Sequence, residues 1–117
     1  MIPKFRAFIK KENKIRNVTT IDFTLKIIEC LNGVLEYEFE YVVLMQSTGL
    51  KDKNGVEIFE GDIGWDDHQE VHGQVIFENG AFKYEWENIS EDLFEVTDDI
   101  EIVGNIYENS ELLEGSE

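Results

Sequence analysis

The sequence TGLKDKNGVEIFEGDI, residues 48–63, separates two regions that both have the residue pattern of β-strands. Asn54-Gly55 is its strongest turn signal, because both residues tolerate the positive φ that a tight reversal requires. Gly49 precedes this pair, and Gly61-Asp62 follows it before a strand that should begin at Ile63. The stretch therefore predicts a turn-rich connector between two β regions, with a short apolar piece between its turns.

The same stretch contains Asp52-Lys53-Asn54-Gly55, which is similar to the middle of an EF-hand calcium loop. In that alignment Leu50 occupies the first ligand position and Gly61 the twelfth, where carboxylates are required. The comparison argues against a calcium site. The turn residues of this stretch are better explained by the backbone geometry of a connector.

Two hairpins are predicted before this connector. The segment Lys4–Ile9 alternates polar and apolar residues, Glu12-Asn13 is a plausible loop, and Ile15–Phe23 is rich in the β-branched residues of a return strand. Next, Asn32-Gly33 separates Lys26–Leu31 from Val34–Met45. A tight loop there pairs Cys30 with Leu35 and Ile28 with Tyr37, and it places Glu29 opposite Glu36.

The second arm of that hairpin alternates acids with aromatics, and we expect the aromatics to be buried. The acids are Glu36, Glu38 and Glu40, and the aromatics are Tyr37, Phe39 and Tyr41. Because successive side chains of a strand point to opposite faces, the pattern predicts one wet face and one face in the core.

A third hairpin is predicted around Asn79-Gly80. This turn pairs Phe77 with Phe82, Val75 with Tyr84 and Gly73 with Trp86, which makes one face apolar. We expect the Trp86 ring to lie over the strand glycine, an arrangement that lets a small sheet coil.

The remaining chain is predicted to contain a helical turn and a last strand. Ser90–Phe94 has a serine followed by acids, the pattern of a capped helical turn. Ile100–Tyr107 alternates as a strand, and Gly104 predicts a bulge or a corner within it. Leu112-Leu113 is the apolar part of a polar tail and is expected either to cap the sheet or to contact a partner. The fold should be mainly β.

Charge divides the 117-residue chain unevenly. Residues 1–55 carry nine Lys or Arg and seven Asp or Glu, a net charge of +2. Residues 56–117 carry Lys83 alone against nineteen acids, a net charge of −18, so that the whole chain has −16. This sign argues against nucleic-acid binding through a broad basic face. Three interpretations stay open: a solvated acidic surface, docking of the basic part on the acidic part of another subunit, and imitation of nucleic acid.

The single cysteine indicates a reducing compartment. Cys30 cannot form an internal disulfide and lies in an apolar run, so a buried small hydrophobe is expected. No secretory apolar region follows Met1, and the longest bulky apolar run is Tyr41–Met45. We therefore expect a cytoplasmic protein that does not span a membrane.

Few residues could support catalysis. His68 and His72 follow Asp66-Asp67, a grouping that could bind a divalent metal, but the spacing of the histidines suits a helix and the segment is predicted as loop and strand. The acid pairs Asp66-Asp67 and Asp98-Asp99 lie in predicted turns. Phosphate loops, dinucleotide fingerprints and nucleophile elbows do not occur. The sequence thus predicts no catalytic, cofactor-binding or metal-binding residue.

Three blocks of the chain resemble the YopX-like family of phage and prophage proteins. They are IPKFRAF (2–8), LMQSTGLKDKNGVEIFEGDI (44–63) and VGNIYENSELL (103–113), in family order and spanning nearly the whole chain. The sequence departs from the family pattern at Ser110, where proline is expected, and at Gly64, where a β-branched residue is usual. The resemblance implies a mainly β protein whose C-terminal part is similar to a small SH3-like barrel. Together with the hairpin pattern, we expect one domain (1–117) in two lobes, an N-terminal β-hairpin lobe (1–47) and a lobe with the central turn and the SH3-like barrel (48–117). The resemblance also implies self-association, and no enzyme activity or site residue.

The leading functional hypothesis is a non-enzymatic, cytoplasmic phage or prophage accessory protein that acts through protein–protein contacts as a homo-oligomer. A first alternative is an acidic decoy that imitates nucleic acid and inhibits a host DNA- or RNA-binding protein. A second alternative is a metal-assisted enzyme that uses Asp66, His68 and His72.

Overall fold

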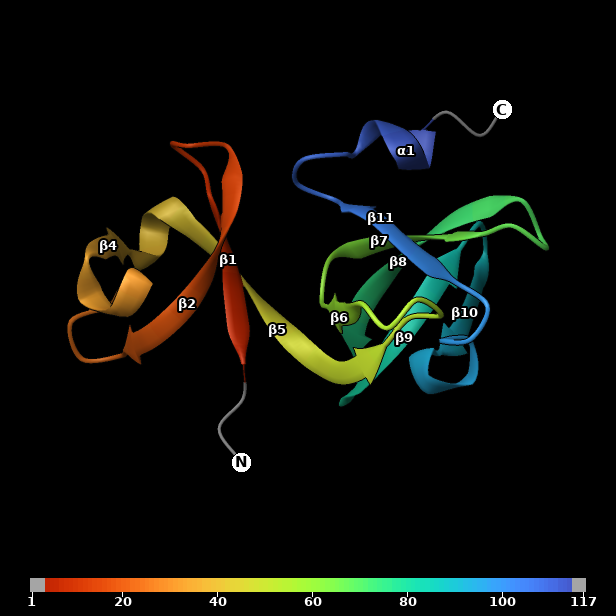
Figure 1. Cartoon of the computed structure of the whole chain (residues 1–117), viewed down its shortest axis with the longest axis horizontal. Helices are drawn as coiled ribbons and strands as arrows, with labels where there is room; N and C mark the ends of the chain where they lie inside the picture. The colour runs from red at the N-terminus through yellow and green to blue at the C-terminus, as the bar shows by residue number, and fades with distance from the viewer. Residues whose placement is uncertain (1–3, 115–117) are drawn as a thin grey trace. The chain divides into compact units, whose positions relative to one another are not determined.

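The computed structural model describes residues 4–114 of the chain (Figure 1). The chain separates into two compact units, Met1–Ser47 and Thr48–Glu117, which we describe one at a time. Residues 2 and 3 of the first family block, and residues 115–117 of the polar tail, lie outside the described residues.

The first unit is built from antiparallel hairpins. Its strands are β1 (Phe5–Ile9), β2 (Lys14–Asp22), β3 (Ile27–Cys30), β4 (Leu35–Glu38) and the first part of β5 (Val42–Lys51). Hydrogen-bonded neighbours follow the order β4-β3-β2-β1-β5, and the order then continues to β6. The predicted pairs Cys30 with Leu35 and Ile28 with Tyr37 are confirmed, and Glu29 does lie opposite Glu36.

The prediction of one continuous strand over Val34–Met45 is wrong. A 3₁₀ turn, η2 (Phe39–Tyr41), separates β4 from β5. The turn takes the chain away from β3, and β5 then pairs with the other side of the first hairpin, Val42 opposite Ile9 and Leu44 opposite Ala7. For this reason Tyr41 does not continue the buried aromatic face and is 51% exposed.

The core of the first unit is small. It consists of Ala7, Ile9, Ile28, Cys30 and Val42, against which Tyr37, Phe39 and other half-buried apolar side chains pack. The free thiol of Cys30 is buried, as predicted, and burial raises its pKa. At the hairpin end, η1 (Leu31–Gly33) forms the tight turn, with Leu31 and Asn32 at positive φ.

The second unit contains an open antiparallel sheet (Figure 1). Its strands are ordered β10-β9-β8-β7-β11 and comprise β7 (Asp62–Asp66), β8 (Val71–Glu78), β9 (Ala81–Trp86), β10 (Ile89–Asp92) and β11 (Glu101–Asn105). The short strand β6 (Glu57–Phe59) follows the end of β5. Within residues 4–114 no sheet closes into a barrel, because β10 and β11 form the two edges of this sheet.

The hairpin around Asn79-Gly80 has the predicted register, with Phe77 opposite Phe82 and Val75 opposite Tyr84. The ring that covers Gly73 is not that of Trp86. An added Cβ at Gly73 would lie 2.5 Å from Cζ of Tyr84, and one at Gly64 would lie 2.9 Å from the Tyr84 hydroxyl oxygen. Because Gly64 and Gly73 are paired across β7 and β8, the Tyr84 side chain occupies the space that both glycines leave.

Two further details differ from the sequence predictions. Ser90 does not start a helical turn, because Ile89–Asp92 pairs with β9 as β10, and the turn η3 (Leu93–Glu95) follows it. Gly49 lies inside β5 at positive φ, where a turn was expected. The register of β11 shifts between Ile102 and Gly104, which confirms the predicted irregularity at this place.

The core of the second unit gathers side chains from β6, β8, β9 and the segment after β10. Its buried members are Ile58, Val75, Tyr84, Leu93, Val96 and Ile100. The last element is the one-turn helix α1 (Glu111–Glu114), which packs near β8. Since α1 is only four residues long, its position depends on this packing and not on helix propensity.

Candidate interaction surfaces

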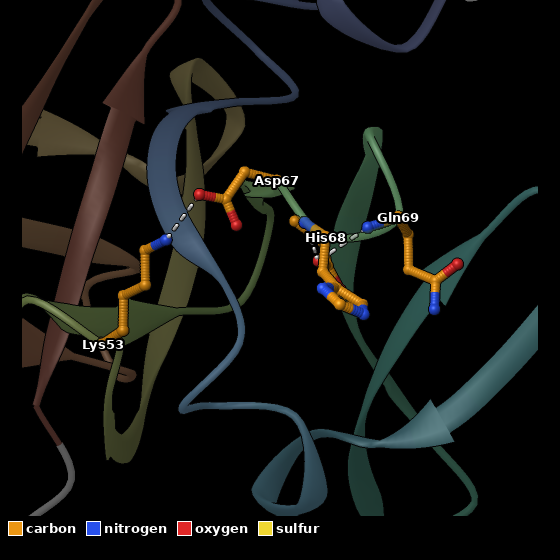
Figure 2. A network of polar contacts seen from close by, with 5 residues as sticks. Lys53, Asp67, His68 and Gln69 are labelled. Atoms are coloured by element: carbon orange, nitrogen blue, oxygen red, sulfur yellow. Dashed lines mark hydrogen bonds and ion pairs between the residues drawn. The ribbon is translucent and has the colours of Figure 1, made fainter.

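Three of the side chains that suggested a metal site lie at the end of β7 and in the polar loop after it (Figure 2). Asp66 is the last residue of β7, and Asp67 and His68 belong to the loop. Asp66 accepts hydrogen bonds through Oδ1 from the backbone N–H groups of His68 and Gln69, at 2.9 and 3.1 Å. Asp67 points toward Lys53, with 3.5 Å between Oδ2 and Nζ, and the imidazole of His68 points elsewhere. The carboxylates thus shape the loop and neutralise a lysine.

His72 belongs to β8, and its ring packs against Trp65 with 4.7 Å between the ring centroids. In residues 4–114 no three His, Cys, Asp or Glu side chains are grouped so that they could hold a metal ion. Asp98 and Asp99 follow η3 as exposed residues in a turn. The structure therefore does not bring Asp66, His68 and His72 together as a ligand set.

Asp52 belongs to the stretch that is similar to the middle of a calcium loop, and the structure shows that its function is structural. Its carboxylate is buried and accepts three backbone N–H groups, those of Asn54 and Val56 on Oδ1 and that of Ile102 on Oδ2, at 2.8 to 2.9 Å. Burial by itself raises the pKa of Asp52, but these donors outweigh it and the pKa lies below its ordinary value. The side chain closes the central turn and ties it to β11.

The second unit contains a small groove between the β8–β9 hairpin and α1, which we name the Trp86 groove. Its volume is about 240 Å³, and its apolar lining consists of Val71, Trp86, Leu112 and Leu113. The predicted apolar pair of the tail, Leu112-Leu113, therefore does lie at the sheet. A groove of this size is smaller than the roughly 300–1,000 Å³ of small-molecule sites and suits one or two side chains.

The polar lining of the Trp86 groove includes two acids. It consists of His72, Gln74, Glu85 and Glu87, without a Lys or Arg among these described residues. Gln74 donates to Glu85 Oε1 at 3.2 Å, and the Trp86 indole N–H donates to Glu91 Oε2 at 2.8 Å. The first bond holds Glu85, one of the two lining acids, in place, and the second fixes the Trp86 side chain, which packs against the core of the second unit.

The first unit exposes apolar side chains at the turn between β2 and β3, which we name the Phe23 turn (Asp22–Lys26). Phe23 is 74% exposed and Leu25 is 66% exposed. Asp22 Oδ1 accepts the backbone N–H groups of Thr24 and Leu25, each at 2.9 Å, and the Lys26 carbonyl accepts the N–H of Phe39 at 2.9 Å. The turn therefore presents its apolar side chains from a fixed backbone.

The first unit also has a hollow, which is wider than the Trp86 groove. Its volume is about 1050 Å³, and it is bordered by Lys10, Lys11, Glu36, Glu38 and Tyr41 among others. Within it Glu12 accepts hydrogen bonds from the Tyr37 hydroxyl at 2.6 Å and from Arg16 Nε at 2.8 Å. The Tyr37 bond is the larger cause of a lowered Glu12 pKa. Both cations and acids border this hollow, so its lining does not favour a ligand of one particular charge.

The net charges of the two units differ strongly. Residues 1–47 carry seven Lys or Arg and six Asp or Glu, a net charge of +1, and residues 48–117 carry three Lys and twenty acids, a net charge of −17. Such a difference favours contacts between unlike units of two molecules over contacts between two acidic units.

Sequence reasoning missed the Phe23 turn, because Phe23 was assigned to the end of the return strand. A signal was present: the sequence Asp22-Phe23-Thr24-Leu25 begins with an Asp that can accept N–H groups two and three residues later and form a turn. The exposure of the phenyl ring at this turn is seen only in the structure.

Comparison with known proteins identifies the family. A profile of the YopX protein family matches residues 4–114. The crystal structure of protein EF1440 from Enterococcus faecalis is similar to this chain, with a TM-score of 0.73 and 33% sequence identity, over 97% of this chain and 99% of that one. Comparison with curated proteins finds no match. No helix in residues 4–114 combines the length and the apolar character needed to cross a membrane. Since the family match covers every described residue, the chain belongs to the YopX family.

Proposed function

We propose that this protein is a non-enzymatic accessory protein of a phage or prophage that acts in the host cytoplasm through protein–protein contacts and associates with itself. In this function the chain needs no catalytic residue, and its surfaces serve recognition. The first unit of one molecule contacts the second unit of another.

The charge difference between the units is the observation that supports this proposal. A second unit of net charge −17 repels a copy of itself, whereas the first unit, at +1 and with seven cations, is the more favourable neighbour. Contacts between unlike surfaces are heterologous, and repeated head-to-tail contacts close into rings when the rotation permits.

The test is a mass measurement by light scattering after size exclusion, at low and at high salt. We expect a mass above that of the 13.6 kDa chain at low salt, and weaker association as salt screens the charges. A monomer at both salt concentrations, over the micromolar range, would remove the proposal.

Charge variants give a matched comparison. Lys11→Glu with Lys14→Glu changes two exposed cations of the first unit, which should weaken association at low salt. Glu36→Gln with Glu38→Gln removes two exposed acids from the same unit and should leave association equal or stronger. Equal loss in both variants would show that charge complementarity is not the cause.

A further inference from the structure

We propose that the Phe23 turn of one molecule inserts into the Trp86 groove of a second copy of this chain. The inference rests on the proposed self-association and names the two surfaces that meet. It follows from the rigidity of the turn, the size and lining of the groove, and the charges beside each.

The Phe23 turn has the properties of a binding anchor. Its two apolar side chains are exposed, and three hydrogen bonds at 2.9 Å fix the turn that carries them, two from backbone N–H groups to Asp22 Oδ1 and one from the Phe39 N–H to the Lys26 carbonyl. The Phe23 ring also contacts the edge of Phe39, with 5.9 Å between the centroids. A side chain that is already ordered loses little conformational entropy on binding, which favours affinity.

The Trp86 groove matches this anchor in size and chemistry. Its volume of about 240 Å³ accommodates one aromatic side chain with part of a second side chain, and the apolar residues that line it are Val71, Trp86, Leu112 and Leu113. An aromatic ring in such a site gains burial against apolar side chains. The indole N–H of Trp86 donates to Glu91, and the side chain packs against the core of the second unit.

Charge orients the contact. The exposed Lys26 ends the Phe23 turn, and Glu85 and Glu87 line the groove, in which no described residue is Lys or Arg. In the proposed contact, Lys26 of one molecule therefore lies beside Glu85 and Glu87 of the other. The Phe23 turn and the groove are different surfaces, so each molecule can offer one and receive the other, and the contact is heterologous.

The first experiment compares full-length variants by light scattering after size exclusion. Phe23→Ala with Leu25→Ala should weaken self-association at least about tenfold, equivalent to about 1.4 kcal/mol. Val34→Ser is the matched control, because Val34 is an equally exposed apolar residue at the other end of β3, and it should leave association unchanged. Far-UV circular dichroism and a thermal melt check that each variant is folded.

The second experiment mixes two variants that should each be defective alone. One lacks the anchor (Phe23→Ala with Leu25→Ala), and the other has a blocked groove (Leu113→Arg). Each should be monomeric where the natural chain associates, and the mixture should form a one-to-one dimer, since one intact anchor and one intact groove remain. The charge exchange Lys26→Glu with Glu87→Lys in one chain should restore part of the association that either change removes.

The outcomes separate this inference from the proposed function. A natural chain that is monomeric at every salt concentration removes both. A natural chain that associates while the anchor variant keeps its mass overturns the inference alone. If only Leu113→Arg dissociates the assembly, the groove receives another part of the second copy, which also overturns the assignment of the Phe23 turn.

Discussion

Asp52 shows how one carboxylate can be essential to a connector without being a ligand. Its two oxygens accept three backbone N–H groups from the central turn and from β11, which lies 50 residues further along the chain. Sequence reasoning found the turn and excluded calcium. The partner in β11 could not be found from the sequence, because only tertiary packing brings Ile102 to Asp52.

Replacing Asp52 by Asn should destabilise the protein by about 2 kcal/mol, because an amide nitrogen would face backbone donors in place of a carboxylate oxygen. Urea unfolding followed by circular dichroism measures the change. Asp98→Asn is the control, since Asp98 is exposed, and it should change stability by less than about 0.5 kcal/mol. Equal stability of Asp52→Asn and the natural chain would contradict the assigned role.

Asp52 should also contribute to the acid sensitivity of the fold. Its pKa is lowered from the ordinary value of 3.8, so the charged form stabilises the folded state above about pH 4, and this contribution is lost as the pH falls through the lowered pKa. The stability difference between the natural chain and Asp52→Asn should therefore be largest near neutral pH and shrink below about pH 4. Unfolding curves at several pH values measure it. A difference that grows in acid would be inconsistent with a lowered pKa.

At the scale of elements, the β7–β8–β9 sheet depends on a tyrosine that lies over two paired glycines. Gly64 and Gly73 face Tyr84, which is 1% exposed. A β-branched side chain at position 64 would meet the tyrosine hydroxyl, so in this chain glycine is the residue that fits.

Gly73→Ala should destabilise the second unit by about 1–3 kcal/mol, because its Cβ would lie 2.5 Å from Cζ of Tyr84. Thermal unfolding measures the loss. Tyr84→Leu in the same chain provides the test of cause: the double variant should be less destabilised than the sum of the single variants, since the smaller side chain leaves room for the methyl group. Strict additivity would argue against the contact as the origin.

Hairpin registers were predictable at this scale, and the breaks between strands were not. Asn32-Gly33 and Asn79-Gly80 restrict the turn geometry, and period-two alternation then aligns the pairs Cys30–Leu35 and Val75–Tyr84. The turn at Phe39–Tyr41 has no such local signal. After this turn β5 pairs with β1, a choice between distant strands that local propensity does not express.

At the scale of the whole molecule, charge is the dominant property. The net charge of −16 at pH 7 comes from the second unit, which carries −17, while the first unit carries +1. The acids of the second unit repel one another in the folded state. Raising NaCl from about 0.01 M to about 0.15 M shortens the Debye length from about 30 Å to about 8 Å and should raise the melting temperature. Calorimetry at low protein concentration measures this. A melting temperature that falls with salt would show that attractive ion pairs outweigh the repulsion.

The sequence by itself determined the mainly β class, the hairpin registers, the central turn, the uneven charge and the family, because turn residues, alternation and charge are local or additive properties. Tertiary structure alone decided that Asp52 binds β11, that Tyr84 and not Trp86 covers Gly73, that the second sheet stays open within residues 4–114, and that Phe23 is exposed. Each of these depends on which distant segments share a core. The packing of the whole chain decides which segments share a core, and a short stretch of sequence does not contain this information.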